Sequence, residues 1–257
     1  MEKNNMNAIR LNTAGLWMVF AIIMSFISHF EVADASDPSP LQDFCVAVDD
    51  PYSAVIVNGR FCKNPKDVKI EDLVYKGFNI PGDTNNTQGA EATLVDVNRF
   101  SALNTLGVSM ARIDFGPFGL NTIHSHPRSS EIFAVLEGTL YVGIVTTDYK
   151  LYDTVLRKGD MIVFPQGLIH FQLNLGKTNA FAIASFGSQN PGRINVVDGL
   201  FGTMPRILDD VLTKAFQVDD TLIERLRSQF SRQNLSINTT GRSILQLFAQ
   251  TTNDCTN

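Results

Sequence analysis

Short apolar runs separated by turn residues divide residues 90–187, and this pattern constrains the fold more than any other feature of the chain. In EIFAVLEGTLYVGIVTT, two such runs flank Glu137-Gly138, a pair typical of a hairpin turn. The stretch DTVLRKGDMIVFPQGLIHFQLNLGKTNAFAIASFG continues the pattern, with turns at 158–159, 165–167 and 176–177. Regularly spaced strands without helical patterns between them predict an antiparallel β-sandwich or barrel.

After Pro205 the apolar residues recur at the spacing of helices. They form two groups, first Leu208, Val211, Leu212, Ala215 and Phe216, then Leu222, Ile223, Leu226 and Phe230. Thr221 and Glu224 fit a capping box at the start of the second group. The sequence therefore predicts two short amphipathic helices within residues 205–232, with apolar stripes buried on the barrel or against another subunit. Residues 233–257 are mostly polar and predict a poorly ordered tail.

The first 35 residues predict a secretory signal peptide. Lys3 and Arg10 supply its positive end, LWMVFAIIMSFI (16–27) its apolar run, and ADA (33–35) its cleavage site. The alternative is a membrane anchor, but about a dozen apolar residues fall short of the ~20 that span a bilayer. We expect cleavage after Ala35, no membrane association afterwards, and a secreted soluble protein whose single folded domain covers residues 36–232.

Charge excludes some partners, and cysteines agree with export. The formal net charge is -5 and no segment is dense in Lys or Arg, which argues against nucleic acid or an acidic membrane surface as partner. Cys45 and Cys62 can form a disulfide in an oxidising compartment, the alternatives being free thiols or metal ligands. Cys255 is left over, as a free thiol or an intermolecular link. Candidate glycosylation sequons lie at Asn85, Asn234 and Asn238.

The histidines beyond the signal all lie in the predicted β region. In HSHPRSSE, His124 and His126 are one residue apart, so a strand would present both on the same face. His170 lies on another predicted strand. Glu131 opens the apolar run IFAVL, where an unpaired carboxylate would be costly to bury and a cation would remove that cost.

Three imidazoles and one carboxylate suit manganese, iron, zinc or nickel rather than calcium or copper(I). If such an ion takes six ligands, two positions remain open to water, dioxygen or a small substrate. The alternative is a closed four-ligand zinc site that only stabilises the barrel. Residue spacing does not separate these two interpretations.

The chain resembles the plant germin-like proteins of the cupin superfamily. HSHPRSSEIFAVLEG matches the first family motif at His124, His126, Glu131 and Gly138, and GDMIVFPQGLIHFQLN matches the second at Gly159, Pro165, Gly167, His170 and Asn174. PLQDFCVA, NGRFCKNP and LNTLGVSMARIDF are similar to further family signatures. The resemblance extends from about Pro40 to Phe230.

The resemblance implies a single β-jellyroll barrel with one manganese ion bound by His124, His126, Glu131 and His170. It also implies a Cys45–Cys62 disulfide and a C-terminal helical pair that clasps neighbouring subunits. Family members form dimers that assemble into hexamers, as trimers of dimers, in the cell wall or apoplast. A homo-oligomer of this kind, in contact with cell-wall components, is therefore expected.

The chain departs from the family pattern just before His124. The family commonly has Gly-Gly-Thr-Asn-Pro-Pro where this chain has FGLNTI (118–123), so Phe118 replaces a glycine, and Thr122 and Ile123 replace two prolines. Losing both prolines should loosen the approach to His124. The tail at 233–257 has no counterpart in a typical family member.

A second departure concerns the substrate. Family members with oxalate oxidase activity carry two asparagines thought to hold oxalate; Asn121 matches one, but Ala111 occupies the other position. An alanine side chain cannot hydrogen-bond a carboxylate, which counts against oxalate turnover.

Three functions follow as expectations. The first is a manganese oxidoreductase of superoxide dismutase type, which needs an open coordination position but no carboxylate clamp. The second is oxalate oxidase, with Asn121 as a substrate contact. The third is a non-catalytic binding or structural protein of the cell wall. A role in defence or stress response is compatible with each of them.

Overall fold

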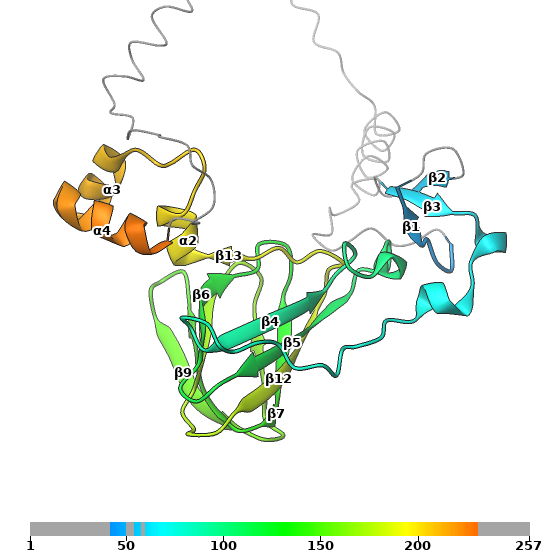
Figure 1. The fold of residues 1–257 in the computed structure, drawn as a ribbon, viewed down its shortest axis with the longest axis horizontal. Helices are drawn as coiled ribbons and strands as arrows, with labels where there is room; N and C mark the ends of the chain where they lie inside the picture. The colour runs from blue at the N-terminus through cyan, green and yellow to red at the C-terminus, as the bar shows by residue number, and fades with distance from the viewer. Residues whose placement is uncertain (1–41, 50–53, 58–59, 231–257) are drawn as a thin grey trace, which may run out of the picture. The chain divides into compact units, whose positions relative to one another are not determined.

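The computed structural model describes residues 42–49, 54–57 and 60–230 (Figure 1). The predicted signal at 1–35 and tail at 233–257 lie outside these ranges, and so do Cys255, Asn234 and Asn238. Asn85, the remaining candidate for glycosylation, is exposed. Within the described ranges, no helix is both long and apolar enough to cross a membrane.

Two five-stranded antiparallel sheets form the body of the described chain, in the orders β10-β7-β12-β5-β4 and β13-β6-β11-β8-β9 (Figure 1). The first contains β4 (Ala90–Val95), β5 (Ser109–Phe115), β7 (Glu131–Glu137), β10 (Met161–Phe164) and β12 (Ala180–Phe186). The second contains β6 (Leu120–Ser125), β8 (Thr139–Val145), β9 (Leu151–Arg157), β11 (Ile169–Asn174) and β13 (Ile194–Asn195). The prediction of an all-β barrel is confirmed.

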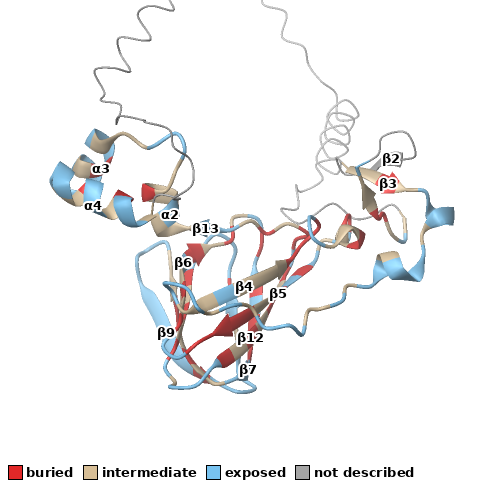
Figure 2. Ribbon diagram, viewed as in Figure 1, coloured by how far each residue is buried: buried red, intermediate tan, exposed pale blue. Residues whose placement is uncertain are grey.

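The core lies between the two sheets, because successive side chains of a strand alternate between core and surface (Figure 2). On β12, buried and half-buried residues alternate along the whole strand. The rings of Phe133 and Phe164 meet edge to face in this core, with centroids 5.9 Å apart. Full burial of such a side chain contributes about 1.5–3 kcal/mol.

A turn at Glu137-Gly138 joins β7 to β8 as predicted, but these strands lie in different sheets and do not pair, so the predicted hairpin is wrong. Gly138 has a φ of +89°, and a Cβ atom there would lie 2.4 Å from the Cβ atom of Ala180. Both the backbone conformation and the space therefore require glycine at this turn.

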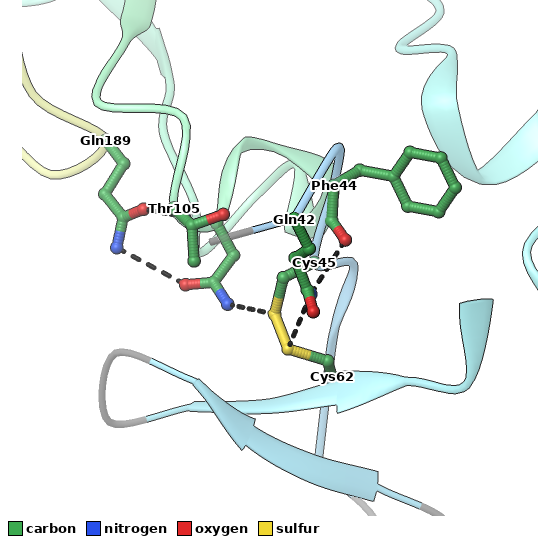
Figure 3. The surroundings of a disulfide bond; sticks show 7 residues. Gln42, Phe44, Cys45, Cys62, Thr105 and Gln189 are labelled. Atoms are coloured by element: carbon green, nitrogen blue, oxygen red, sulfur yellow. Dashed lines mark hydrogen bonds between the residues drawn. A yellow bond between two sulfur atoms is a disulfide. The ribbon is translucent and has the colours of Figure 1, made fainter. Parts of the chain in front are cut away.

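The N-terminal part of the described chain is a small sheet of β1 (Ala47–Val48), β2 (Ala54–Val57) and β3 (Arg60–Lys63), in the order β1-β3-β2. Three 3-10 turns follow, η1 (Pro65–Asp67), η2 (Ile70–Leu73) and η3 (Ser101–Leu103). Cys45 and Cys62 are joined by a disulfide with a Cα–Cα distance of 5.0 Å (Figure 3). These thiols are thus neither free nor metal ligands in the structure.

Replacing both Cys45 and Cys62 by alanine should lower the free energy of unfolding by about 3 kcal/mol, since the bridge closes a short loop and restricts the unfolded chain. The two cysteines are 17 residues apart. Chemical denaturation of the metal-free protein measures this loss. Cys255→Ala is the matched control and should unfold like the wild type; a double variant as stable as this control would contradict the prediction.

Three helices follow the barrel: α2 (Val196–Phe201), α3 (Asp209–Phe216) and α4 (Asp220–Phe230). The two predicted helices are α3 and α4; α2 has six residues, too few for a helical period to be recognised. Their apolar stripes pack against one another, around buried Phe201, Leu212 and Ile223. The predicted capping box is wrong, because Asp219 caps α4 by accepting a hydrogen bond from the Leu222 N–H at 3.0 Å.

Candidate metal centre

Four buried side chains converge where the two sheets face each other: His124, His126, Glu131 and His170. Each offers one ligand atom, and these atoms all lie within 4.8 Å of one another. His124 lies on β6 and His126 directly follows that strand, Glu131 is the first residue of β7, and His170 lies on β11. The structure thus brings together all four residues of the predicted ligand set.

The strand pairing explains this convergence. His124 of β6 and His170 of β11 are direct partners in one sheet. In the other sheet, Glu131 lies between Phe164 and Phe186 on the neighbouring strands. Glu131 and Phe133 are both buried while Ile132 between them is exposed, so the carboxylate points inward with the core residues.

Backbone carbonyls fix the tautomer of each imidazole. The Nδ1 atom of His124 lies 2.6 Å from the Thr122 oxygen, and that of His170 lies 2.8 Å from the Leu168 oxygen. The Nδ1 atom of His126 contacts the Gly192 oxygen in the same way. A carbonyl oxygen can only accept, so each Nδ1 carries a proton, and in the neutral form each ring presents an Nε2 lone pair.

These lone pairs face a carboxylate oxygen that offers no proton. The Glu131 Oε2 atom lies 3.2 Å from Nε2 of His126 and 3.4 Å from Nε2 of His170. Glu131 Oε2 and His170 Nε2 are buried and have no hydrogen-bond partner among the described residues. Buried acceptors left unpaired are costly, and a divalent cation between them would satisfy them all. The donor set therefore fits a metal ion with nitrogen and oxygen ligands.

Burial lowers the pKa of His124 far below its usual range, and the electrostatic effects of Arg193 and of the neighbouring His170 and His126 rings lower it further. For Glu131, burial raises the pKa, but the adjacent imidazoles of His126 and His170 lower it more, so its pKa is also below the usual value. At neutral pH the site therefore presents a neutral imidazole at His124 and an ionised carboxylate. Both are the forms that bind metals.

The metal-free protein should lose stability as the pH falls from about 7.5 to 5.5. His124 takes up a proton in the unfolded chain near its ordinary pKa of about 6.5 but not in the folded protein, so acid favours unfolding. The lowered pKa of Glu131 has the same sign and adds its effect below about pH 5. Chemical denaturation of the chelated protein at both pH values measures the change.

His124→Gln is the control for this pH dependence, because it removes the titrating group while keeping a polar side chain. Its unfolding free energy should change less between the two pH values than that of the wild type. Equal slopes for the two proteins would contradict the assignment of the effect to His124.

Asn121, the predicted substrate contact, is buried beside this cluster, and a β-bulge places it there. Three positions separate Asn121 from His124, so strict alternation would put them on opposite faces of β6. Their partners on β11, Gln172 and His170, are only two positions apart, and the extra residue turns both β6 side chains inward. The Asn121 Nδ2 atom donates to Gln172 Oε1 at 2.6 Å.

Ala111 faces the core from β5, close to the row of residues that contains Glu131. It pairs with Ala184, which pairs with Phe133, two positions after Glu131. Its methyl group offers no hydrogen bond. The interior position that the resemblance assigns to a second asparagine is therefore apolar in this chain.

The loop before β6 takes an unusual conformation at Phe118, where the family commonly has glycine. Phe118 has a φ of 56°, in the left-handed region that favours glycine, and its side chain is exposed. The structure thus keeps a glycine-like backbone without a glycine. That the loss of two prolines loosens the approach to His124 stays a prediction.

Of two cavities in this part of the barrel, the larger includes a member of the cluster in its lining, and the smaller includes Asn121 but none of the four. One of about 510 Å³ is lined by Glu131, Phe164, Phe186 and neighbouring residues. A smaller one of about 220 Å³ is lined by Glu91, Asn121, Thr122, Arg193 and Asn195, among others. The sequence analysis did not single out Gln172 or Arg193; the position of Gln172 two residues after His170 on one strand was a usable signal for the former.

Comparison with known proteins gives consistent matches. A family model described as Cupin matches residues 76–224. Germin-like protein subfamily 1 member 7 of Arabidopsis thaliana is 52% identical over 217 residues, covering 83% of this chain and 92% of that protein. Putative germin-like protein 2-1 of Oryza sativa subsp. japonica is 50% identical over 220 residues, covering 84% and 100%. A solved oxalate oxidase in complex with the substrate analogue glycolate superposes with a TM-score of 0.73 at 45% identity, covering 77% of this chain and all of that one.

Proposed function

This chain belongs to the germin-like proteins of the cupin family, and from that premise we propose that it is a secreted, manganese-binding oxidoreductase whose substrate is superoxide. The observation that carries the proposal is the convergence of four buried ligand atoms, from His124, His126, Glu131 and His170. Two of these atoms, Glu131 Oε2 and His170 Nε2, have no hydrogen-bond partner among the described residues. Three nitrogens and one oxygen suit manganese and leave coordination positions open to a small substrate. Superoxide needs no further contact from the protein, so Ala111 does not exclude it.

When bound, manganese would supply a one-electron redox centre, able to oxidise one superoxide to dioxygen and reduce a second one, with two protons, to hydrogen peroxide. The protein holds the ligands in place for this chemistry. Phe164 stacks on His170 with ring centroids 4.3 Å apart, and Phe186 packs against His126 at 4.7 Å. These rings and the carbonyl contacts at Nδ1 fix the imidazole planes.

The test is superoxide consumption by the manganese-loaded protein, followed by the decay of superoxide absorbance. The control is His170→Ala mixed with the same total manganese, because free manganese consumes superoxide by itself. The proposal requires a clearly faster decay with the wild type. Equal decay in both samples would exclude a protein-bound centre of this kind.

Oxalate oxidase is the second candidate, with oxalate and dioxygen converted to carbon dioxide and hydrogen peroxide. It is favoured by the likeness to solved oxalate oxidases at 45–46% identity and by the buried Asn121. Ala111 counts against it, because the interior lacks a second amide there. A fully loaded protein that turns over neither superoxide nor oxalate would leave a non-catalytic binding or structural role.

We further propose that the protein acts outside the cell, in the plant cell wall or apoplast, in defence or stress response. The signal pattern cleaved after Ala35, the Cys45–Cys62 disulfide and the exposed Asn85 sequon support this location. The N-terminal sequence and glycan content of the protein recovered from plant wall fluid test it. An intact signal or a purely intracellular pool would contradict it.

We also propose a homo-oligomer, a hexamer built as a trimer of dimers. Val163, Ile132, Ser185 and Met110 form one row across the outer face of a sheet, and its three apolar members are exposed. Exposed apolar rows of this kind favour association. Sedimentation of the wild type beside Ile132→Lys tests the proposal, and a monomeric wild type would refute it.

A further inference from the structure

Arg193 lies against the strand that carries two of the candidate ligands. Its predecessor Gly192 provides the carbonyl oxygen that contacts His126 Nδ1. Two residues after it, Asn195 of β13 pairs with His124 of β6. The backbone on both sides of Arg193 is thus tied to the His-x-His segment, which places its side chain at the edge of the candidate metal centre.

Among the described residues, the hydrogen bonds of the Arg193 guanidinium go to two side-chain amide oxygens. Its Nη2 atom donates to Asn121 Oδ1 at 2.9 Å, and its Nε atom donates to Asn195 Oδ1 at 2.6 Å. None of the ion pairs found in the described part of the chain involves Arg193. The nearest acidic groups act at longer range; Asp198, for example, is held by Asn195 Nδ2. The positive charge therefore has no carboxylate partner at contact distance.

Several N–H groups of this guanidinium have no hydrogen-bond partner in the described part of the chain and can bind a ligand. A guanidinium has five N–H donors, and the structure uses one at Nε and one at Nη2. The remaining donors include both N–H groups of Nη1. The Nη1–Nη2 edge can therefore bind a carboxylate through two parallel hydrogen bonds. This residue lines the cavity of about 220 Å³ together with Asn121, which limits the ligand to a few heavy atoms.

Arg193 also sets the direction of a hydrogen-bond chain into the barrel. Because a guanidinium can only donate, Asn121 must turn Oδ1 toward it and Nδ2 toward Gln172. Gln172 then accepts through Oε1, and its Nε2 is left as a donor. Gln172 is fully buried, and that Nε2 has no partner among the residues described. The interior next to His170 therefore presents an unpaired donor, the group that an anion would satisfy.

We propose that Arg193 determines the specificity of this site for small carboxylate anions, which it binds through its free guanidinium edge while it orients Asn121. The inference rests on the proposed function, because the anion is taken to compete with superoxide at the metal centre, or to be the substrate in the second candidate reaction, oxalate oxidation. Glu91 lines the same cavity and limits the number of negative charges accepted there. A ligand with one carboxylate group should therefore bind there with Arg193 as its positively charged partner and should need no second cation.

Calorimetric titration of the manganese-loaded protein with glycolate tests this, with glycolamide as the uncharged analogue. Arg193→Met should weaken glycolate binding about 10- to 100-fold, the range for a lost hydrogen bond to a charged group, and leave glycolamide binding unchanged. The glycolate affinity of Arg193→Lys should lie between those of the wild type and Arg193→Met, because lysine keeps the positive charge but lacks the two parallel N–H donors. Arg128→Met is the matched control: Arg128 lies beside Gly192 but donates to Asn190, and its loss should change glycolate binding less than about threefold.

Unchanged glycolate affinity in Arg193→Met would overturn the proposal. Equal weakening of glycolate and glycolamide, with a lower metal content, would assign Arg193 a structural role only and would also overturn it. Failure of the proposed function is a separate result: the wild type would lack manganese or superoxide turnover. Even then, glycolate binding by the wild type and weaker glycolate binding by Arg193→Met would support the inference.

Discussion

Replacing His170 by alanine should abolish stoichiometric manganese binding and remove the stabilisation that manganese gives the wild type. His170 supplies one of four converging ligand atoms, and its Nε2 has no hydrogen-bond partner in the described structure. At a manganese concentration about 100 times the dissociation constant, binding adds about 2.7 kcal/mol, or roughly 5–10 °C in melting temperature for a chain of this size. The variant should show no such rise.

The measurement is metal content per chain together with melting temperature, with and without excess manganese. Removing the imidazole of His170 also leaves a gap beside Phe164. The metal-free wild type and the metal-free variant must therefore be compared, to separate this loss of packing from the loss of metal. Phe171→Ala is the control for damage to β11, because Phe171 neighbours His170 but is not part of the cluster. A His170→Ala protein that keeps one equivalent of manganese would refute the assigned ligands.

The barrel and the ligand cluster were predictable because both depend on simple periodicity. Alternation within a strand places His124 and His126 on one face, and the same rule makes a buried carboxylate at Glu131 conspicuous in an apolar run. Which strands pair was not readable from the residues. That His170 joins His124 in one ligand set came from the family resemblance, and the structure shows the two residues as direct strand partners.

The features that sequence reasoning missed depend on irregular backbone or on distant contacts. The bulge between β6 and β11 reverses the face of Asn121, and no residue type marks it. Arg193 acquires its role only because residues 192–195 run beside β6, 72 positions from its partner Asn121. Helix α4 begins at Asp220 and is capped by Asp219, two residues before the predicted cap Thr221, because an aspartate caps a helix as well as a threonine does. Local patterns cannot report any of these.

Exchanging Ala111 for asparagine should raise oxalate-dependent hydrogen peroxide release by about 10- to 100-fold over the wild type, the scale on which one well-placed polar donor acts on charge in an active site. Strand pairing places residue 111 in the interior row next to that of Glu131. An amide there would add a hydrogen-bonding group on the side of the cluster opposite Asn121, so a carboxylate substrate would have donors from both sheets.

The substitution should also destabilise the oxalate-free protein by about 1–3 kcal/mol, because it buries an unpaired amide in a close-packed row. Ala182→Asn is the matched control. Ala182 is equally buried on the neighbouring strand but pairs with Ile113 and Val135, one row further from Glu131. This control should lose similar stability and gain no oxalate activity.

The outcome is read at full manganese occupancy, as peroxide released per bound metal. Release that appears in Ala111→Asn and not in Ala182→Asn would mean that the missing amide is what separates this chain from oxalate turnover. No oxalate-dependent peroxide release from a folded Ala111→Asn protein with full manganese occupancy would mean that residue 111 does not limit the reaction.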